Sequence, residues 1–209
     1  LSFFENQILT NIYLPDLMAV KSWDPTTNTL IYDESIYKKS SDSWVRSYSY
    51  PKKQVPTPQE SFKIFITKHM SVASDKNSGF ITLSLKHQSP YVAKQWTEII
   101  VKGINAFYRE NDKLMSLKAI NFLNQQISMT SLSEVKQVIA NLLQKETKKL
   151  ALIEANQYYV FDYIDPPAIM EQKSEPNRSI ICILSLIFGG ILSSFLVIFR
   201  HYAFSKAVR

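Results

Sequence analysis

The chain has 209 residues, of which 45% are hydrophobic and 20% are charged, so it has enough apolar material for a folded core and is not a disordered protein. Four glycines against nine prolines exclude collagen-like and flexible-linker chains and argue against a glycine-rich phosphate-binding loop. The net charge is +6, and a single cysteine, Cys182, excludes a disulfide framework or a cysteine-based metal site within one chain.

The first part of the chain shows weak patterns. Apolar residues at helical spacing predict an amphipathic helix that breaks near Pro15: Leu1, Phe4, Ile8 and Ile12. Residues 21–55 lack clear periodicity and predict mostly loop, with one short strand near 44–48. A cap at Thr57, with Glu60 completing a capping box, predicts a helix that runs to about Lys68.

A β-hairpin and two long helices follow. Residues 70–74 and 80–86 predict two strands joined by a polar turn in which Gly79 is available for positive φ. Helices are predicted over about 90–128, opened by Ser89 and Pro90, and over 132–157, opened by a capping box of Ser131 and Glu134. Joined by a tight connection, the two helices should form an antiparallel pair, with Trp96 packed on the apolar stripe.

Residues 158–164 are aromatic and β-branched, which predicts a third strand that pairs with the hairpin. Residues 165–178, rich in proline, predict an extended connector. The fold class expected is therefore α+β, with a small sheet, a long antiparallel helical hairpin and a C-terminal transmembrane helix. The expected domains are an α+β domain at 1–164, the connector, the span at 179–199 and a tail at 200–209.

The span is the strongest single pattern in the sequence. Residues 180–199 contain no charge, and at about 1.5 Å per residue a helix of this length matches the hydrocarbon thickness of a bilayer. Small residues four apart predict faces for close helix packing, although small residues are also common in any membrane helix: Ser185, Gly189 and Ser193, and Gly190 with Ser194.

The charges around the span predict its orientation. The tail after Phe199 carries Arg200, Lys206 and Arg209 and no acid, so we expect a cytoplasmic C-terminus and an outward-facing domain. Export of that domain needs a targeting segment, so we expect the sequence to be part of a longer protein with an N-terminal membrane helix.

The order of these elements resembles the chain-length determinant proteins of bacterial surface polysaccharide synthesis, which are polysaccharide co-polymerases. The resemblance covers about residues 57–209 and is most specific before the span, where Asp165, Pro166, Ser174, Pro176 and Arg178 match the family pattern. Met170 and Asn177 stand where the family usually has proline and lysine, which affects the expected stiffness of the connector.

The resemblance implies an inner-membrane protein with a periplasmic α+β domain, a sheet near the membrane and no catalytic site or cofactor of its own. It implies a ring-shaped homo-oligomer that acts with the polysaccharide polymerase on the growing lipid-linked chain and sets the length of O-antigen or a related polysaccharide. The related group carries a cytoplasmic kinase domain after the last span, and we do not expect this chain to belong to it, because only ten residues follow Phe199 in the sequence.

Two surfaces are candidate binding sites. Hairpin residues that would contact neighbouring subunits, or equally pack within one protomer, are Leu114, Leu117, Val135, Ile139 and Leu142. Trp44, Tyr48 and Tyr50 are candidates for glycan contact, since aromatic rings match sugar faces, and subunit contact is the alternative for the same residues.

The sequence offers little support for catalysis or nucleic-acid binding. His69 and His87 bracket the predicted hairpin without a third ligand at metal-like spacing, and Glu110 and Asp112 do not face each other on a helix. The lysine doublets do not form the basic stripe of a nucleic-acid site. The alternatives to a co-polymerase are a membrane-anchored periplasmic adaptor or sensor, and a membrane-bound glycan enzyme.

Overall fold

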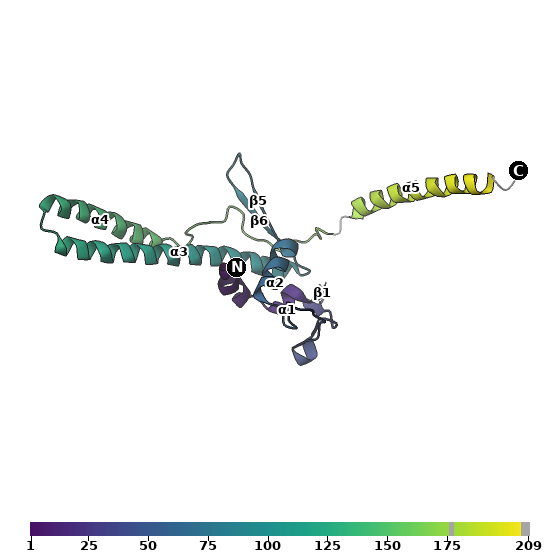
Figure 1. The fold of residues 1–209 in the computed structure, drawn as a ribbon, viewed down its shortest axis with the longest axis horizontal. Coiled ribbons are helices and arrows are strands. Elements are labelled where there is room, and N and C mark those ends of the chain that lie inside the picture. The colour runs from purple at the N-terminus through teal and green to yellow at the C-terminus, as the bar shows by residue number, and fades with distance from the viewer. Residues whose placement is uncertain (176–177, 206–209) are drawn as a thin grey trace. The chain divides into compact units, whose positions relative to one another are not determined.

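A computed structural model describes residues 1–175 and 178–205, with side chains described for 1–175 and 179–199. The chain divides into two units, Leu1–Ile169 and Met170–Arg209. The first is a mixed α+β unit with two-stranded sheets and a long helical pair, and the second contains the C-terminal helix (Figure 1). The predicted α+β class is confirmed.

The elements of the first unit follow one another with short connections. Its helical elements are η1 (Phe4–Ile8), η2 (Leu9–Asn11), α1 (Leu14–Met18), η3 (Lys39–Ser41), α2 (Pro58–Ile64), η4 (Phe65–His69), α3 (Pro90–Met129) and α4 (Ser133–Ala155). Its strands are β1 (Val20–Asp24), β2 (Thr29–Tyr32), β3 (Tyr37–Lys38), β4 (Ser43–Trp44), β5 (Met70–Ser74) and β6 (Ile81–Leu85). The strands pair antiparallel in sequence order, β1 with β2, β3 with β4 and β5 with β6.

The core of this unit lies where the N-terminal turns and η4 meet the first half of α3. Phe4 and Ile8 of η1, Phe65 of η4, and Trp96 and Ile100 of α3 are each at most 4% exposed. Burial of several large apolar side chains at one point supplies the main stabilisation of a small unit. Of the four positions that the N-terminal periodicity selected, Phe4, Ile8 and Ile12 are buried, whereas Leu1 is 56% exposed. The segment forms π and 3₁₀ turns and not one regular helix.

Residues 21–55 contain more regular structure than their pattern predicts. β1 and β2 form a hairpin whose turn is held by the Asp24 carboxylate, which accepts hydrogen bonds from the Thr26 amide and from the hydroxyls of Thr26 and Thr27. Asn28 takes positive φ in this turn. The prediction of mostly loop is wrong here, because Asp, Thr and Asn close the turn without the glycine that usually marks a hairpin.

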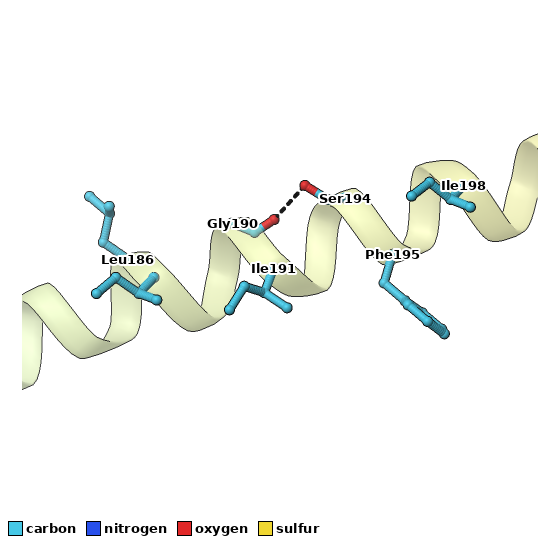
Figure 2. A pocket seen from close by; sticks show the side chains of 7 residues that line it. Leu186, Gly190, Ile191, Ser194, Phe195 and Ile198 are labelled. Carbon is cyan, nitrogen blue, oxygen red and sulfur yellow. Dashed lines mark hydrogen bonds between the residues drawn. The ribbon is translucent and has the colours of Figure 1, made fainter.

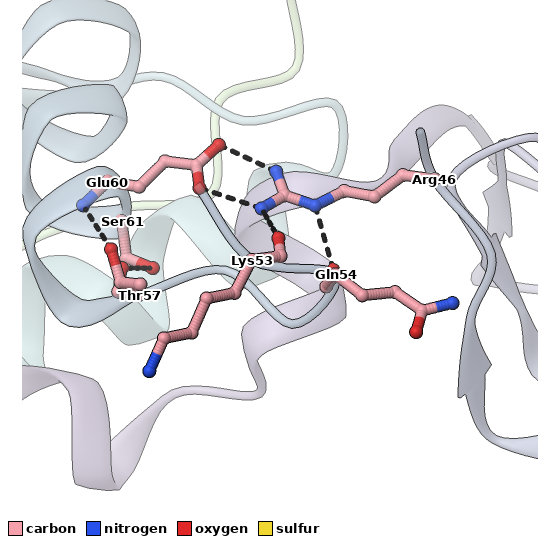
Figure 3. A network of polar contacts seen from close by, with 6 residues as sticks. All are labelled: Arg46, Lys53, Gln54, Thr57, Glu60 and Ser61. Atoms are coloured by element: carbon pink, nitrogen blue, oxygen red, sulfur yellow. Dashed lines mark hydrogen bonds and ion pairs between the residues drawn. The ribbon is translucent and has the colours of Figure 1, made fainter. Parts of the chain in front are cut away.

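Helix α2 begins as predicted, but its acidic residue has a different partner. The Thr57 hydroxyl accepts a hydrogen bond from the Glu60 amide at 3.3 Å, which is the expected N-cap. The Glu60 carboxylate does not return to the Thr57 backbone and instead accepts two hydrogen bonds from Arg46, at 2.6 and 2.7 Å (Figure 3). A cation distant in sequence therefore replaces the second half of the capping box.

The predicted β5–β6 hairpin forms, with Val72 opposite Leu83, and Gly79 takes the expected positive φ, 73°, in the Asp75–Gly79 turn. Leu83 and Leu85 contact the core, whereas Val72 and Ile81 are more than half exposed. The hairpin is thus attached to the core at its base and exposed at its far end.

Helices α3 and α4 form the predicted antiparallel pair, and they lie side by side in Figure 1. The predicted capping box at Ser131 and Glu134 is wrong, because α4 begins at Ser133 with Leu132 as its N-cap residue and no side-chain cap. The amide and the hydroxyl of Thr130 both donate to the Gln126 carbonyl, so Thr130 caps the C-terminus of α3.

The third strand predicted over 158–164 does not form. The backbone amides of Tyr159, Val160 and Phe161 all donate to the side-chain oxygen of Asn105, at 2.7–3.1 Å, and the Asn105 amide donates to the Phe161 carbonyl at 2.9 Å. Asn105 is 5% exposed, so one buried carboxamide satisfies the backbone groups that a strand ladder would have used. The β5–β6 sheet remains two-stranded.

Candidate functional site

The second unit contains helix α5 (Arg178–Ser205), which has the length and composition of a membrane-spanning helix. Its segment Ser179–Phe199 has 21 residues and a mean hydropathy of 2.6, and none of the side chains in its most apolar window is buried. Exposed apolar side chains on every face are unfavourable in water and favourable in lipid, so this helix could act as a membrane anchor.

One face of α5 carries a shallow groove centred on small residues (Figure 2). It is lined by Leu186, Ile187, Gly190, Ile191, Ser194, Phe195 and Ile198. The hydroxyls of Ser193 and Ser194 donate to the Gly190 carbonyl at 2.9 and 2.8 Å, so these polar groups are satisfied within the helix. The predicted face of Gly190 and Ser194 coincides with the groove. Ser185, Gly189 and Ser193 are exposed and do not line it.

The residues of the family motif are only partly described. Asp165, Pro166 and Ser174 are exposed and lie outside helices and strands, as expected for an extended connector. Pro176 lies outside the described residues, and Arg178 is described only as the first residue of α5.

The structure separates the five candidate contact residues of the α3–α4 pair into two groups. Ile139 is 8% exposed and belongs to the interior of the pair, so it is not available to a neighbouring subunit. Leu114, Leu117, Val135 and Leu142 are 38–55% exposed and remain available for contacts with another molecule. The pair is also joined by an ion pair between Lys113 and Glu154 at 2.6 Å, and the Lys113 ammonium lowers the pKa of the Glu154 carboxyl.

The aromatic candidates are also in different environments. The ring of Trp44 is partly buried and lies 5.3 Å from the ring of Tyr37. Tyr37 is itself 1% exposed, and its hydroxyl bonds to Asp42 and Tyr13, which raises the pKa of the Tyr37 phenol. Tyr48 and Tyr50 are 59% and 96% exposed. Trp44 is thus part of a packed aromatic cluster, and the two tyrosines are the surface candidates.

His69 and His87 lie close together, on either side of the base of the β5–β6 hairpin. Their ring centroids are 6.1 Å apart and lie 5.5 and 4.9 Å from the Trp96 ring. A His69 ring nitrogen is 2.8 Å from the Lys86 carbonyl, and one of His87 is 3.0 Å from the Asp16 carbonyl. Burial lowers the pKa of both imidazoles. Within the described part of the chain no group of three metal-ligating side chains is found.

Two contacts of this unit have no signal in the local sequence. The Arg46–Glu60 ion pair joins residues 14 positions apart, and Asn105 contacts residues more than 50 positions away. Asp112, which the sequence presents as half of an unpaired acidic couple, accepts a hydrogen bond from the Tyr159 hydroxyl at 2.6 Å. A polar residue on the buried face of a long helix, such as Asn105, is the one feature that could have indicated a long-range partner.

The chain matches no protein-family model and no curated protein at a significant level.

Proposed function

We propose that this protein is a membrane-anchored polysaccharide co-polymerase that regulates the chain length of O-antigen or a related bacterial surface polysaccharide. The order of elements carries the proposal: an exposed β-hairpin, a 40-residue helix, an antiparallel partner helix, an extended segment that begins with Asp165 and Pro166, and an apolar helix long enough to span a bilayer. This order accompanies the sequence motif that resembles the family.

In this proposal α5 anchors the chain in the inner membrane, and the first unit faces the periplasm. The excess of basic residues after Phe199 supports a cytoplasmic C-terminus. Reporter fusions placed before and after α5 test the orientation. Periplasmic activity of the fusion placed after α5 would contradict it.

The proposed mechanism is organisational and not enzymatic. Several copies assemble into a ring, in which the α3–α4 pairs of neighbours contact each other through the exposed residues Leu114, Leu117, Val135 and Leu142. The ring binds the polymerase and limits how long it retains the growing lipid-linked chain. The small-residue groove of α5 provides a second surface where another membrane helix can approach closely.

The exposed apolar side chains of α3 and α4 also suit a second candidate function, that of a periplasmic adaptor or sensor with the helical pair as its docking surface. The two functions differ in what their loss does to surface polysaccharide. An adaptor leaves the polysaccharide length distribution unchanged when it is deleted.

The deciding experiment is the length distribution of surface polysaccharide in a deletion strain, complemented with the parent chain or with a variant that carries Leu114→Ser and Leu142→Ser. A co-polymerase predicts loss of the preferred length on deletion, restoration by the parent and a scattered distribution with the double variant. Thr147→Ser, at an exposed α4 position, is the matched control and should restore the parent pattern. An unchanged distribution in the deletion strain contradicts the proposal. Turnover of glycan by the isolated protein would instead assign it to the glycan enzymes.

A further inference from the structure

The loop between β4 and α2 projects from the first unit with an unusual composition. Residues 47–55 are all exposed, and they include Tyr48, Tyr50 and Val55, which are 59%, 96% and 54% exposed. Lys52 and Lys53 follow the tyrosines, and no acidic residue occurs between Asp42 and Glu60. The loop therefore combines exposed aromatic rings with two lysines and has no acidic residue of its own.

This loop is held in shape at its base. Arg46 donates from its guanidinium to the backbone carbonyls of Lys53 and Gln54, at 2.5 and 2.8 Å, and so connects the two ends of the loop (Figure 3). The same guanidinium forms the bidentate pair with Glu60 on α2, and both side chains are about 14% exposed. The Gln54 side chain also donates to the Trp44 carbonyl at 2.7 Å. The positive charge of Arg46 is neutralised inside this network, and the lysines supply the charge that the loop presents.

Because the loop is already ordered, it loses little further conformational entropy on binding. Its two exposed tyrosines therefore indicate a contact surface. Tyrosine rings are favourable at the headgroup level of a bilayer, where the ring lies against apolar material and the hydroxyl stays hydrated. Lysines beside them are attracted to anionic lipid phosphates. The same chain contains α5, and only the short segment 170–177 joins α5 to the first unit.

We infer that the 47–53 loop docks on the anionic headgroup surface of the bilayer that α5 crosses, with Tyr48 and Tyr50 at headgroup level and Lys52 and Lys53 against lipid phosphates. The inference rests on the membrane anchoring in the proposed function and is independent of the chain-length role. A glycan is less well suited to this loop, because residues 47–55 are all exposed, whereas small-ligand sites are usually concave and lined by converging polar groups.

The test uses the full chain in lipid vesicles, in a Cys182→Ser background so that the native thiol on α5 is not labelled. Ser49→Cys places a fluorophore between the two tyrosines and keeps both rings, and Thr147→Cys places the same fluorophore on α4 as the reference position. Lipids that carry a headgroup quencher then report which label contacts the membrane surface. Vesicles with and without anionic phosphatidylglycerol test the charge requirement.

The label at position 49 should be quenched strongly in anionic vesicles, weakly in zwitterionic vesicles and more than the label at position 147. Lys52→Gln with Lys53→Gln should weaken the docked state roughly 30-fold, about fivefold for each lysine near an anionic surface. Arg46→Met with Glu60→Met removes the ion pair that holds the base of the loop and should weaken docking while Lys52 and Lys53 remain.

Each alternative outcome is distinct. Equal quenching at positions 49 and 147, or quenching that ignores lipid charge, overturns the inference. A response at position 49 to added polysaccharide repeat units but not to lipid assigns the loop to glycan. A response that depends on the protein-to-lipid ratio alone assigns it to a second copy, and both results overturn lipid docking. A chain that fails to float with vesicles refutes the anchoring itself, whereas one that floats without position-dependent quenching refutes only the docking of the loop.

Discussion

Apolar residues of the N-terminal core are enclosed by several elements, whereas those of the α3–α4 pair lie mostly at the surface. Trp96 and Ile100, near the start of α3, are at most 4% exposed because η1, η4 and the β5–β6 hairpin surround them. Leu114, Met115 and Phe122, farther along the same helix, are 55–59% exposed. One helix thus serves as a core element at one end and as an uncovered surface at the other.

This difference indicates how the protein divides its tasks. A two-helix pair has only one seam, so it cannot bury apolar residues that point away from that seam. The N-terminal core contains the main cluster of buried apolar side chains, and the far part of α3 and α4 has apolar surface that a partner can cover.

Trp96→Ala should lower the free energy of unfolding by about 3–5 kcal/mol, because it removes the largest fully buried side chain and leaves a cavity that Phe65 and the two histidines cannot fill. Urea unfolding in detergent, followed by circular dichroism, measures the change. Phe122→Ala, on the exposed part of the same helix, is the matched control and should change the value by less than about 1 kcal/mol. Equal effects of the two substitutions would show that the distant part of α3 is as well packed as the core.

Asn105→Ala should cost about 2–3 kcal/mol, because three backbone amides around Val160 lose their acceptor and must find water. The segment can move outward to do so, which limits the loss to less than three full hydrogen bonds. Hydrogen exchange at residues 159–161 should accelerate more than exchange in α4. Asn124→Ala, at an exposed position of α3, should leave both quantities unchanged, and similar exchange in the two variants would contradict the role of Asn105.

The same contrast explains which elements could be predicted from sequence. Helices α3 and α5 are long, and their apolar patterns are set within the helix itself, so local periodicity was enough. The 158–164 segment has strand-forming residues, but Asn105, more than 50 positions earlier, takes the backbone amides that a strand would use. No local pattern contains that partner. The β1–β2 hairpin was missed because Asp24 and Asn28 form its turn without glycine.

The candidate site residues show a related limit. Periodicity identified Ile139 and Leu142 as equivalent apolar positions, whereas the antiparallel partner buries the first and leaves the second 46% exposed. Composition grouped Trp44 with Tyr48 and Tyr50, although only Trp44 packs on Tyr37. Sequence could therefore select residues with the right chemistry, but exposure depends on the neighbours that tertiary structure supplies.

Acidification should destabilise the protein through the two histidines that pack beside Trp96 in the core. The rings of His69 and His87 lie 6.1 Å apart, and Trp96, Asp16 and Lys68 are their neighbours. Burial lowers the pKa of both imidazoles below the ordinary 6.5. The unfolded chain therefore binds more protons near pH 6, so the stability present above pH 6.5 is lost as the pH falls toward the folded-state pKa values. Urea midpoints measured from pH 7.5 to 5.5 should fall. In a variant with His69→Gln and His87→Gln, the urea midpoint should depend less on pH. An equal dependence of the urea midpoint on pH in parent and variant would show that the histidines do not cause it. The Glu60 carboxyl does not contribute, because its lowered pKa lies below this pH range.

The smallest effect on folding is expected for Leu114→Ser combined with Leu142→Ser. Both side chains are about half exposed, so the free energy of unfolding of the isolated chain should change by less than about 1 kcal/mol. Ile139→Ser is the internal reference and should cost about 2–4 kcal/mol, because it removes a side chain buried between α3 and α4. If copies assemble through these side chains, as proposed, light scattering of the detergent-solubilised protein should show a smaller assembly for the double variant. A loss of stability comparable to that of Ile139→Ser, without a change in mass, would place Leu114 and Leu142 in the protomer's own core. An unchanged mass with unchanged stability would show that the exposed face of the helical pair is not where the subunits meet.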